Sequence, residues 1–363
     1  MQDANNNQSA VSGQKNSGLR QFAVKMCISF SLAVGLLIAG ECVAYYHLPH
    51  AEGRGSNYKP YVIWQAHPRL AWQNVDAEGL RLTSHSYCGA DEYTIWIFGS
   101  SNLWGFLVHD GETIASQLAR KYEEAGRRVC VRNYAQPGYA STQELIALML
   151  ALKRVQKKPD MVIFYDGVID SYLPCESEEI DAHQGFNNFK RQFESWRSMD
   201  EAGFSYIRNT NTYVALQRFA RLRSLVTDAG APRSIPPERG VELARRTMDN
   251  YSKNMEILSV LGAHYGFHHL SFWEPWLPAA EKPLSSEEML IRARGENDSS
   301  GERRAVRATY EMFRKTNQAR LFYLGDVFKD HPETMFLGNG DLAPAGNVVV
   351  AERIYQILQH PGS

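Results

Sequence analysis

The chain has 363 residues, of which 44% are hydrophobic and 22% are charged, values that are ordinary for a folded protein and that exclude general disorder. Lys and Arg total 39 and Asp and Glu total 40, which gives a formal net charge of −1. This balance, together with the lack of a recognisable reader motif, gives no support for nucleic-acid binding. The five cysteines show no zinc-type spacing, so neither a metal nor an organic cofactor is implied.

The N-terminal residues have the pattern of a tail followed by a membrane anchor. Residues 1–19 are rich in Asn, Gln, Ser and Gly and are predicted to be a disordered cytoplasmic tail. Residues 20–46 are predicted to be a transmembrane signal anchor, in which Lys25 snorkels and Glu41 lies at the far interface. Lys15, Arg20 and Lys25 all lie on the N-terminal side of the apolar run, which places everything after Tyr46 outside the cytoplasm. A cleaved signal peptide ending near Cys42 is the main alternative, and Glu41 disfavours that cleavage site. A buried core helix is a third interpretation.

Residues 47–70 are mostly polar, contain interspersed glycine and proline, and are predicted to be a linker. One domain is expected over residues 71–363. An irregular stretch at about 171–240, rich in Arg, Asn and aromatic residues, is interpreted as an insertion or lid within that domain.

From Thr94 onward, short apolar runs alternate with segments of helical periodicity. Strands are predicted at 94–98, 128–133, 160–165, 267–273 and 321–324. Helices are predicted at 113–126, 141–153, 241–265, 302–318 and 348–358, with Ser141 or Thr142 as the N-cap of the second. The alternation predicts a parallel sheet covered on both faces, with a ligand site beyond the carboxyl ends of the strands.

Four polar turns are therefore candidates for the ligand site. Residues 98–105 (Phe-Gly-Ser-Ser-Asn-Leu-Trp-Gly) follow the first strand, residues 133–143 follow the second, and residues 165–171 follow the third. Residues 338–347 lead into the closing helix. Taken singly, each is explained as an ordinary turn or helix cap.

Taken together and in this order, the four segments resemble the SGNH/GDSL hydrolase superfamily, closest to its membrane-anchored bacterial members, over roughly residues 70–360. Residues 78–81 (Glu-Gly-Leu-Arg), Glu274-Pro275 and residues 282–288 add to the likeness. The resemblance implies a flavodoxin-like three-layer α/β/α sandwich with a parallel sheet. It also implies a bacterial inner-membrane location, with the domain in the periplasm or outside.

The same resemblance implies a set of catalytic positions. The nucleophile position falls on Ser101 and the oxyanion glycine on Gly138. Ile169 stands where the family has an oxyanion asparagine, Asp341 stands where it has the histidine base, and Gly338 stands where it has the partner aspartate. The set is therefore degenerate: the nucleophile and one oxyanion donor remain, while the base and its partner are replaced.

These replacements matter chemically. A serine hydroxyl needs a base with a pKa near neutral, whereas an ordinary aspartate titrates around 3.9. Ile169 has no side-chain donor, and losing one oxyanion donor costs roughly 3 kcal/mol of transition-state stabilisation. His331, His109 and His183 are candidate substitute bases, although a surface histidine is the better interpretation of each. His331 is preferred because its loop leads towards Asp341.

Two functions follow from these residues. The first is a non-catalytic protein that binds an acylated glycan or lipid, or a protein partner, in an envelope polysaccharide pathway. The alternative is an active serine esterase or O-acyltransferase that uses Ser101 with a non-standard base. A flavodoxin-like nucleotide binder is disfavoured because no glycine-rich phosphate loop follows the first strand. Of Cys88, Cys130 and Cys175, two can form a disulfide, but the pairing is open and free thiols are an equal alternative.

Overall fold

The computed structural model describes five stretches of the chain: residues 24–42 except 27, 33, 37 and 41, then 56–66, 73–195, 235–296 and 301–360. The chain divides into two compact units. One unit comprises Met1–Glu52 and Gln192–Ala231, and the other comprises Gly53–Arg191 and Pro232–Ser363. The second unit holds the sheet and every predicted site residue.

In the first unit, the described residues between Val24 and Cys42 are helical. Within the described part of the chain, no helix is both long enough and apolar enough to cross a membrane. The predicted tail at 1–19 lies outside the described residues, and so does part of the predicted anchor at 20–46.

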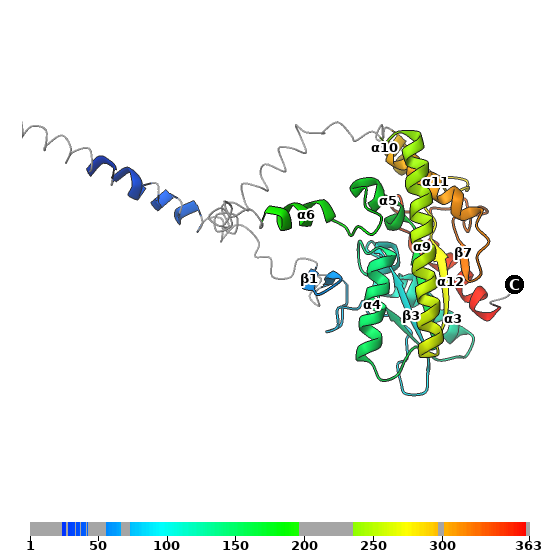
Figure 1. Cartoon of the computed structure of the whole chain (residues 1–363). Coiled ribbons are helices and arrows are strands. Elements are labelled where there is room, and N and C mark those ends of the chain that lie inside the picture. The colour runs from blue at the N-terminus through cyan, green and yellow to red at the C-terminus, as the bar shows by residue number, and fades with distance from the viewer. Residues whose placement is uncertain are drawn as a thin grey trace, which may run out of the picture. The chain divides into compact units, whose positions relative to one another are not determined.

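A five-stranded parallel sheet forms the centre of the second unit (Figure 1). Its strands, in chain order, are β3 (Tyr93–Gly99), β4 (Val129–Asn133), β5 (Met161–Asp166), β6 (His268–Trp273) and β7 (Leu321–Tyr323). Their order in the sheet is β4-β3-β5-β6-β7. Counted from the first parallel strand this is 2-1-3-4-5, the order of flavodoxin-like sheets.

Both faces of this sheet are buried, because alternate residues of each strand point to opposite sides. Ile95 and Ile163 belong to one apolar core, together with residues of α3 (Ile114–Glu124) and α12 (Pro344–Gln359). Their strand neighbours Trp96 and Val162 belong to a second core. That second core contains residues of α4 (Ser141–Arg154), α9 (Pro237–Tyr265) and α11 (Glu302–Arg314). The predicted three-layer α/β/α sandwich is confirmed.

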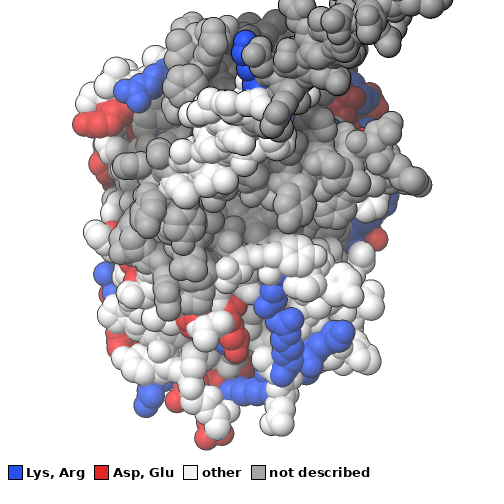
Figure 2. Space-filling view, turned by 90° about the vertical axis from the view of Figure 1, so that its left-hand side faces the viewer, with Lys and Arg blue, Asp and Glu red and all other residues white. Residues whose placement is uncertain are grey.

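The remaining described elements of this unit lie at its edges and in its connections. They are the strands β1 (Ser56–Lys59) and β2 (Ile63–Ala66), the short helical segments α2 (Ser101–Trp104) and η1 (Asp110–Glu112), and the helices α5 (Val168–Ser177), α6 (Phe186–Ser195) and α10 (Ser286–Glu296). Helix α6 crosses the boundary between the two units. On the face shown in Figure 2, basic and acidic side chains both occur on the described surface.

The predicted linker at 47–70 needs correction, because β1 and β2 form an antiparallel hairpin within it. The hairpin docks on the turn after β4: Trp64 Nε1 donates to Pro137 O at 3.0 Å, and the Ala66 N–H donates to Gln136 Oε1 at 2.7 Å. Trp64 also packs edge-on against Tyr139, with ring centroids 5.4 Å apart. Contacts with residues some 70 positions later therefore order a segment whose local composition is typical of a linker.

The second predicted helix begins as expected, but its cap differs. Ala140 is the N-cap residue of α4, and Ser141 is the first helical residue. The carboxylate of Asp170, from α5, accepts hydrogen bonds from the Ser141 N–H at 3.1 Å and the Ser141 hydroxyl at 2.5 Å. A side chain distant in sequence thus takes the capping role that local residues usually supply.

The predicted insertion or lid at 171–240 is only partly described. It begins inside α5 and includes α6, while residues 196–234 lie outside the described residues. Helix α9 starts at Pro237, four residues before the predicted start, because proline is well suited to the first turn of a helix.

The open cysteine pairing is resolved. Cys88 and Cys130 form a disulfide that ties the loop before β3 to the buried strand β4. Cys175 is a buried free thiol, and burial raises its pKa to about 12.

Candidate functional site

The predicted nucleophile lies in a sharp turn between β3 and α2. An ideal Cβ at Gly99 would lie 2.6 Å from Tyr165 O, so only glycine fits at the end of this strand. Ser100 is the N-cap of α2 and is buried, and its hydroxyl has no hydrogen-bond partner in the described part of the chain. Ser101 is the first helical residue and is partly exposed. Among the described residues, none forms a hydrogen bond with the Ser101 hydroxyl.

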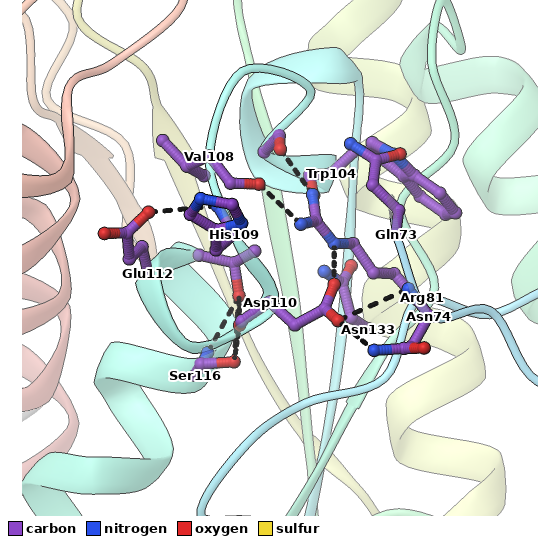
Figure 3. Close-up of polar contacts among 12 residues, drawn as sticks. Gln73, Asn74, Arg81, Trp104, Val108, His109, Asp110, Glu112, Ser116 and Asn133 are labelled. Carbon is purple, nitrogen blue, oxygen red and sulfur yellow. Dashed lines mark hydrogen bonds and ion pairs between the residues drawn. The ribbon is translucent and has the colours of Figure 1, made fainter. Parts of the chain in front are cut away.

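A buried arginine holds the turn that follows Ser101 (Figure 3). The Arg81 guanidinium donates to the carbonyls of Trp104 and Gly105, and to that of Val108 at 2.7 Å. Its Nε pairs with Asp110 Oδ1 at 3.0 Å, which balances the buried charge. Because a planar guanidinium presents its donors in a fixed fork, this contact sets the path of the loop and gives the resembling segment 78–81 a structural role.

Gly138 lies in the turn after β4, at the same edge of the sheet as Ser101. Its φ of 79° is in the left-handed region that favours glycine, and a Cβ there would collide with the side chain of Gln184. Ile169 lies in α5 and packs against the small apolar cluster of Ala140, Leu173 and Ala182. Its side chain therefore offers neither a donor nor an acceptor to the edge of the sheet.

Gly338 and Asp341 are neighbours in space, as the two positions of a base and its orienting partner would be. The N–H groups of Leu337 and Gly338 donate to Asp341 O at 2.8 and 3.3 Å. An ideal Cβ at Gly338 would lie 2.8 Å from Asp341 Oδ2. Burial raises the pKa of Asp341.

A third carboxyl, Glu274, lies next to this loop and was given no role in the sequence analysis. It follows β6 and is fully buried, and its carboxylate accepts hydrogen bonds from Asn102 Nδ2 at 2.6 Å and from the Val168 N–H at 2.7 Å. Gly340, in the loop that carries Gly338 and Asp341, lies close to Asn102, the donor to Glu274. An ideal Cβ built on Gly340 would lie 3.0 Å from Asn102 Nδ2. The pKa of Glu274 is raised to about 8, chiefly by burial; the hydrogen bonds from Val168 and Asn102 oppose this shift, and the charges of Asp170 and Asp341 add to it.

Three more carboxyls are buried behind Glu274: Glu144, Asp166 and Asp170. Burial raises all three pKa values, that of Asp170 to about 6, and their mutual repulsion adds to the effect for Glu144 and Asp166. Tyr251 donates its hydroxyl to Asp166 Oδ2 at 3.0 Å. In the described part of the chain, no group of His, Cys, Asp and Glu side chains is arranged to hold a metal ion.

The three candidate histidines all lie in other contacts. His331 Nδ1 is 2.9 Å from the Glu333 carboxylate, at a partly exposed position. His109 is exposed and caps η1, and His183 packs among Trp64, Phe186 and Phe189. No described imidazole is hydrogen-bonded to Ser101.

A buried ion pair supports the segment that leads to Asp341. Lys282 pairs with Glu288, and both side chains are fully buried. Glu288 also accepts hydrogen bonds from the N–H groups of Met335 and Phe336 at 2.9 and 3.2 Å. This contact gives segment 282–288 a structural role.

An apolar cavity of about 380 Å³ adjoins the Ser101 and Gly138 turns. Hairpin residues Ser56, Trp64 and Ala66 line one side. The rest of the wall consists of Trp104 at the end of α2, Phe106 in the turn after it, Pro137, and Gln184, Gly185 and Phe189. No local sequence pattern marks this cavity, because its walls come from four separate segments.

The structure is similar to several solved esterases and lipases. An acetyl xylan esterase, AlAXEase, matches with a TM-score of 0.39 and 10% identity, over 73% of this chain and 99% of the other. TesA matches with a TM-score of 0.37 and 13% identity, over 73% and 98%. A G-D-S-L family lipolytic protein from Veillonella parvula matches with a TM-score of 0.38 and 12% identity, over 74% and 98%. No protein-family model and no curated protein sequence matches the chain.

The site therefore combines a partly exposed serine, a glycine turn and an apolar cavity on one side with a group of buried carboxyls on the other. An unassisted serine hydroxyl is a weak nucleophile, because its proton has no acceptor of suitable pKa. The arrangement offers shape and apolar surface for binding, whereas the transfer of a proton from Ser101 has no described route.

Proposed function

We propose that this chain is a membrane-anchored, extracytoplasmic SGNH/GDSL-hydrolase-like protein that binds an acylated glycan at the Ser101 edge without cleaving it. One observation carries the proposal: the serine hydroxyl has no imidazole partner among the described residues, while the base position holds Asp341. Loss of one member of a catalytic triad lowers the rate by roughly 10⁴-fold or more.

Binding without turnover suits a protein that delivers or recognises an acylated polymer during envelope assembly. A protein partner in the same pathway is the second candidate ligand of the Ser101 edge. Nucleic acid is a poor candidate, since the net charge is −1 and both signs of charge occur on the described face in Figure 2.

The experiment is fluorophosphonate labelling of the full chain beside Ser101→Ala, with His331→Ala as a third sample. We expect no labelling of the wild type above the Ser101→Ala background, and no change on removing His331. In parallel, an O-acetylated oligosaccharide should bind more tightly than its deacetylated counterpart. Labelling that is abolished by Ser101→Ala would contradict the proposal, as would equal binding of the two oligosaccharides.

The alternative is an active esterase or O-acyltransferase, and Glu274 is the observation that favours it. A carboxyl with a pKa of about 8 lies in the range useful for a general base. Its oxygens accept hydrogen bonds from Asn102 and Val168, however, and no described hydrogen bond joins Glu274 to Ser101, so the two side chains would have to move together for a proton transfer. Labelling that disappears in both Ser101→Ala and Glu274→Gln would favour this alternative.

The extracytoplasmic location rests on two features. The basic residues precede the apolar segment, and disulfides such as Cys88–Cys130 persist mainly in oxidising compartments. We expect the chain to resist carbonate extraction from membranes, and we expect Cys88 and Cys130 to react with a maleimide only after reduction. Release by carbonate, or alkylation of both cysteines without reductant, would contradict this location.

A further inference from the structure

Two described segments present aromatic side chains to solvent. In the hairpin, Tyr58 and Tyr61 are 77% and 78% exposed. On α6, Phe189 and Phe193 are 46% and 66% exposed, and their spacing of four residues puts them on one face of the helix. An apolar residue exposed on its own needs no explanation, whereas a group of them marks a surface that binds a partner.

The hairpin and the start of α6 are joined by a chain of ring contacts. Tyr58 is the cross-strand partner of Trp64. Trp64 packs edge-on against His183, with ring centroids 6.1 Å apart, and His183 packs against Phe189 at 5.2 Å. Phe186, one turn before Phe189, packs against a buried apolar cluster and so holds α6 in place. The exposed rings therefore belong to one surface, the aromatic face, which consists of Tyr58, Tyr61, Phe189 and Phe193.

The charges within the aromatic face are mainly positive. Lys59 lies between the two tyrosines in sequence, and Lys190 and Arg191 lie between the two phenylalanines. Residues 56–61 and 186–194 contain these three basic residues and one acidic residue, Glu194, a net charge of +2 in a chain whose total is −1. Aromatic rings beside Lys and Arg are typical of segments that lie in the headgroup region of an anionic bilayer.

The length of chain before the hairpin limits its distance from the membrane. Under the proposed function the anchor ends at Tyr46, and β1 begins at Ser56. The ten peptide units between them span at most about 35 Å. A globular domain of about 290 residues is roughly 50 Å across. If the opposite side of the domain faced the bilayer, the connecting chain would have to extend farther than it can. The side that carries the hairpin is therefore held towards the lipid.

We propose that the aromatic face lies in the headgroup region of an anionic bilayer, so that the Ser101 edge opens beside the membrane surface. Phe189 connects the two, because it borders the cavity whose wall includes Phe106, and the Phe106 N–H donates to Ser101 O at 3.4 Å. This inference rests on the proposed function, since the anchor sets the distance to the lipid. It narrows the ligand to a glycan that is carried on a lipid at the membrane surface.

The test is photocrosslinking of the full chain to lipid in nanodiscs that contain phosphatidylglycerol. The photoreactive residue p-benzoylphenylalanine, which bonds to C–H groups that it touches, is incorporated in place of Tyr61, Phe193 or Val260. Val260 is the matched control, because it is 68% exposed but lies on α9, outside the aromatic face. We expect lipid adducts at the first two positions and none above background at the third.

A charge variant tests the contribution of the anionic headgroups. A basic residue near an anionic surface contributes about 1 kcal/mol, so Lys190→Ala should lower the yield of lipid adduct at position 193 by up to about fivefold. The same variant should have no effect in nanodiscs of phosphatidylcholine alone. Lys253→Ala is the matched control, since Lys253 is an exposed lysine on α9 that pairs with Asp249, and it should leave the yield unchanged.

Three results would overturn the inference: lipid adducts at neither aromatic position, equal yields at all three positions, or adducts to another protein in place of lipid. The proposed function can fail separately. Lipid adducts at positions 61 and 193, with no binding of an O-acetylated oligosaccharide, would keep the membrane contact and refute the glycan ligand. Binding of the oligosaccharide without lipid adducts would do the reverse.

Discussion

The two sides of the sheet's carboxyl edge differ in what fills them. Beside β3 and β4, the turns that carry Ser101 and Gly138 border an apolar cavity. Beside β5 and β6, the corresponding space is closed and contains Glu144, Asp166 and Glu274, all with raised pKa values. One side has space for an apolar ligand. On the other side, the raised pKa values favour the protonated form of the carboxyls.

In the proposed function, the altered base position and the binding surface belong to different sides of this edge. The base position is supported from the carboxyl side, whereas the ligand surface is built by the hairpin and by the turn after β4. We therefore expect changes on one side to leave the other largely intact, and mutations can test that independence.

The largest effect is expected from breaking the ion pair on the carboxyl side. Glu288→Ala leaves Lys282 charged and fully buried without its partner, and it frees the N–H groups of Met335 and Phe336. Removing one partner of a buried pair costs about 3–5 kcal/mol, so the free energy of unfolding should fall by that amount in denaturant titrations.

Glu287→Ala is the matched control for that variant. Glu287 neighbours Glu288 in α10 and bonds to the Thr334 and Ser286 side chains at an exposed position, so its loss should change stability far less. If binding of the O-acetylated oligosaccharide fell as sharply as stability in Glu288→Ala, the two sides would not be independent.

A smaller effect is expected from Glu274→Gln, measured as a change in pH dependence. The folded-state pKa of Glu274 is about 8, above its ordinary value of 4.5, so the folded protein keeps a proton that the unfolded chain releases. Stability from this group is complete below about pH 4.5 and is lost as pH rises towards 8. The wild type should therefore become less stable between pH 5 and pH 8, and the variant should lose less.

Each pKa unit corresponds to about 1.4 kcal/mol. Between pH 5 and pH 8, the free energy of unfolding of the variant should therefore fall by at least that much less than that of the wild type. Part of the wild-type trend should persist, because Asp166 and Glu144 have pKa values raised in the same direction. Unfolding midpoints at pH 5 and pH 8 measure the effect. Identical slopes for wild type and variant would show that Glu274 is ionised throughout this range.

The sequence was a good guide to the sheet and a poorer guide to what lies on it. Periodicity located β3 and β5, and the position of Ser101 after a buried strand correctly placed it at the carboxyl edge. The hairpin at 56–66 escaped prediction because its stabilising partners, such as Tyr139, lie far away in sequence. Likewise, the raised pKa of Glu274 arises from burial by several elements, which no local pattern contains.

The N-terminal position of the hairpin has a consequence for the order in which the protein matures. Trp64 leaves the ribosome long before Pro137 and Phe189, which complete the cavity with it. Until those residues emerge, the hairpin of β1 and β2 has no partner surface against which Trp64 can pack. An isolated two-stranded hairpin is marginally stable in water. Closure of the cavity should therefore be a late folding event, and a truncated chain that begins after residue 66 should keep the sheet but lose the cavity.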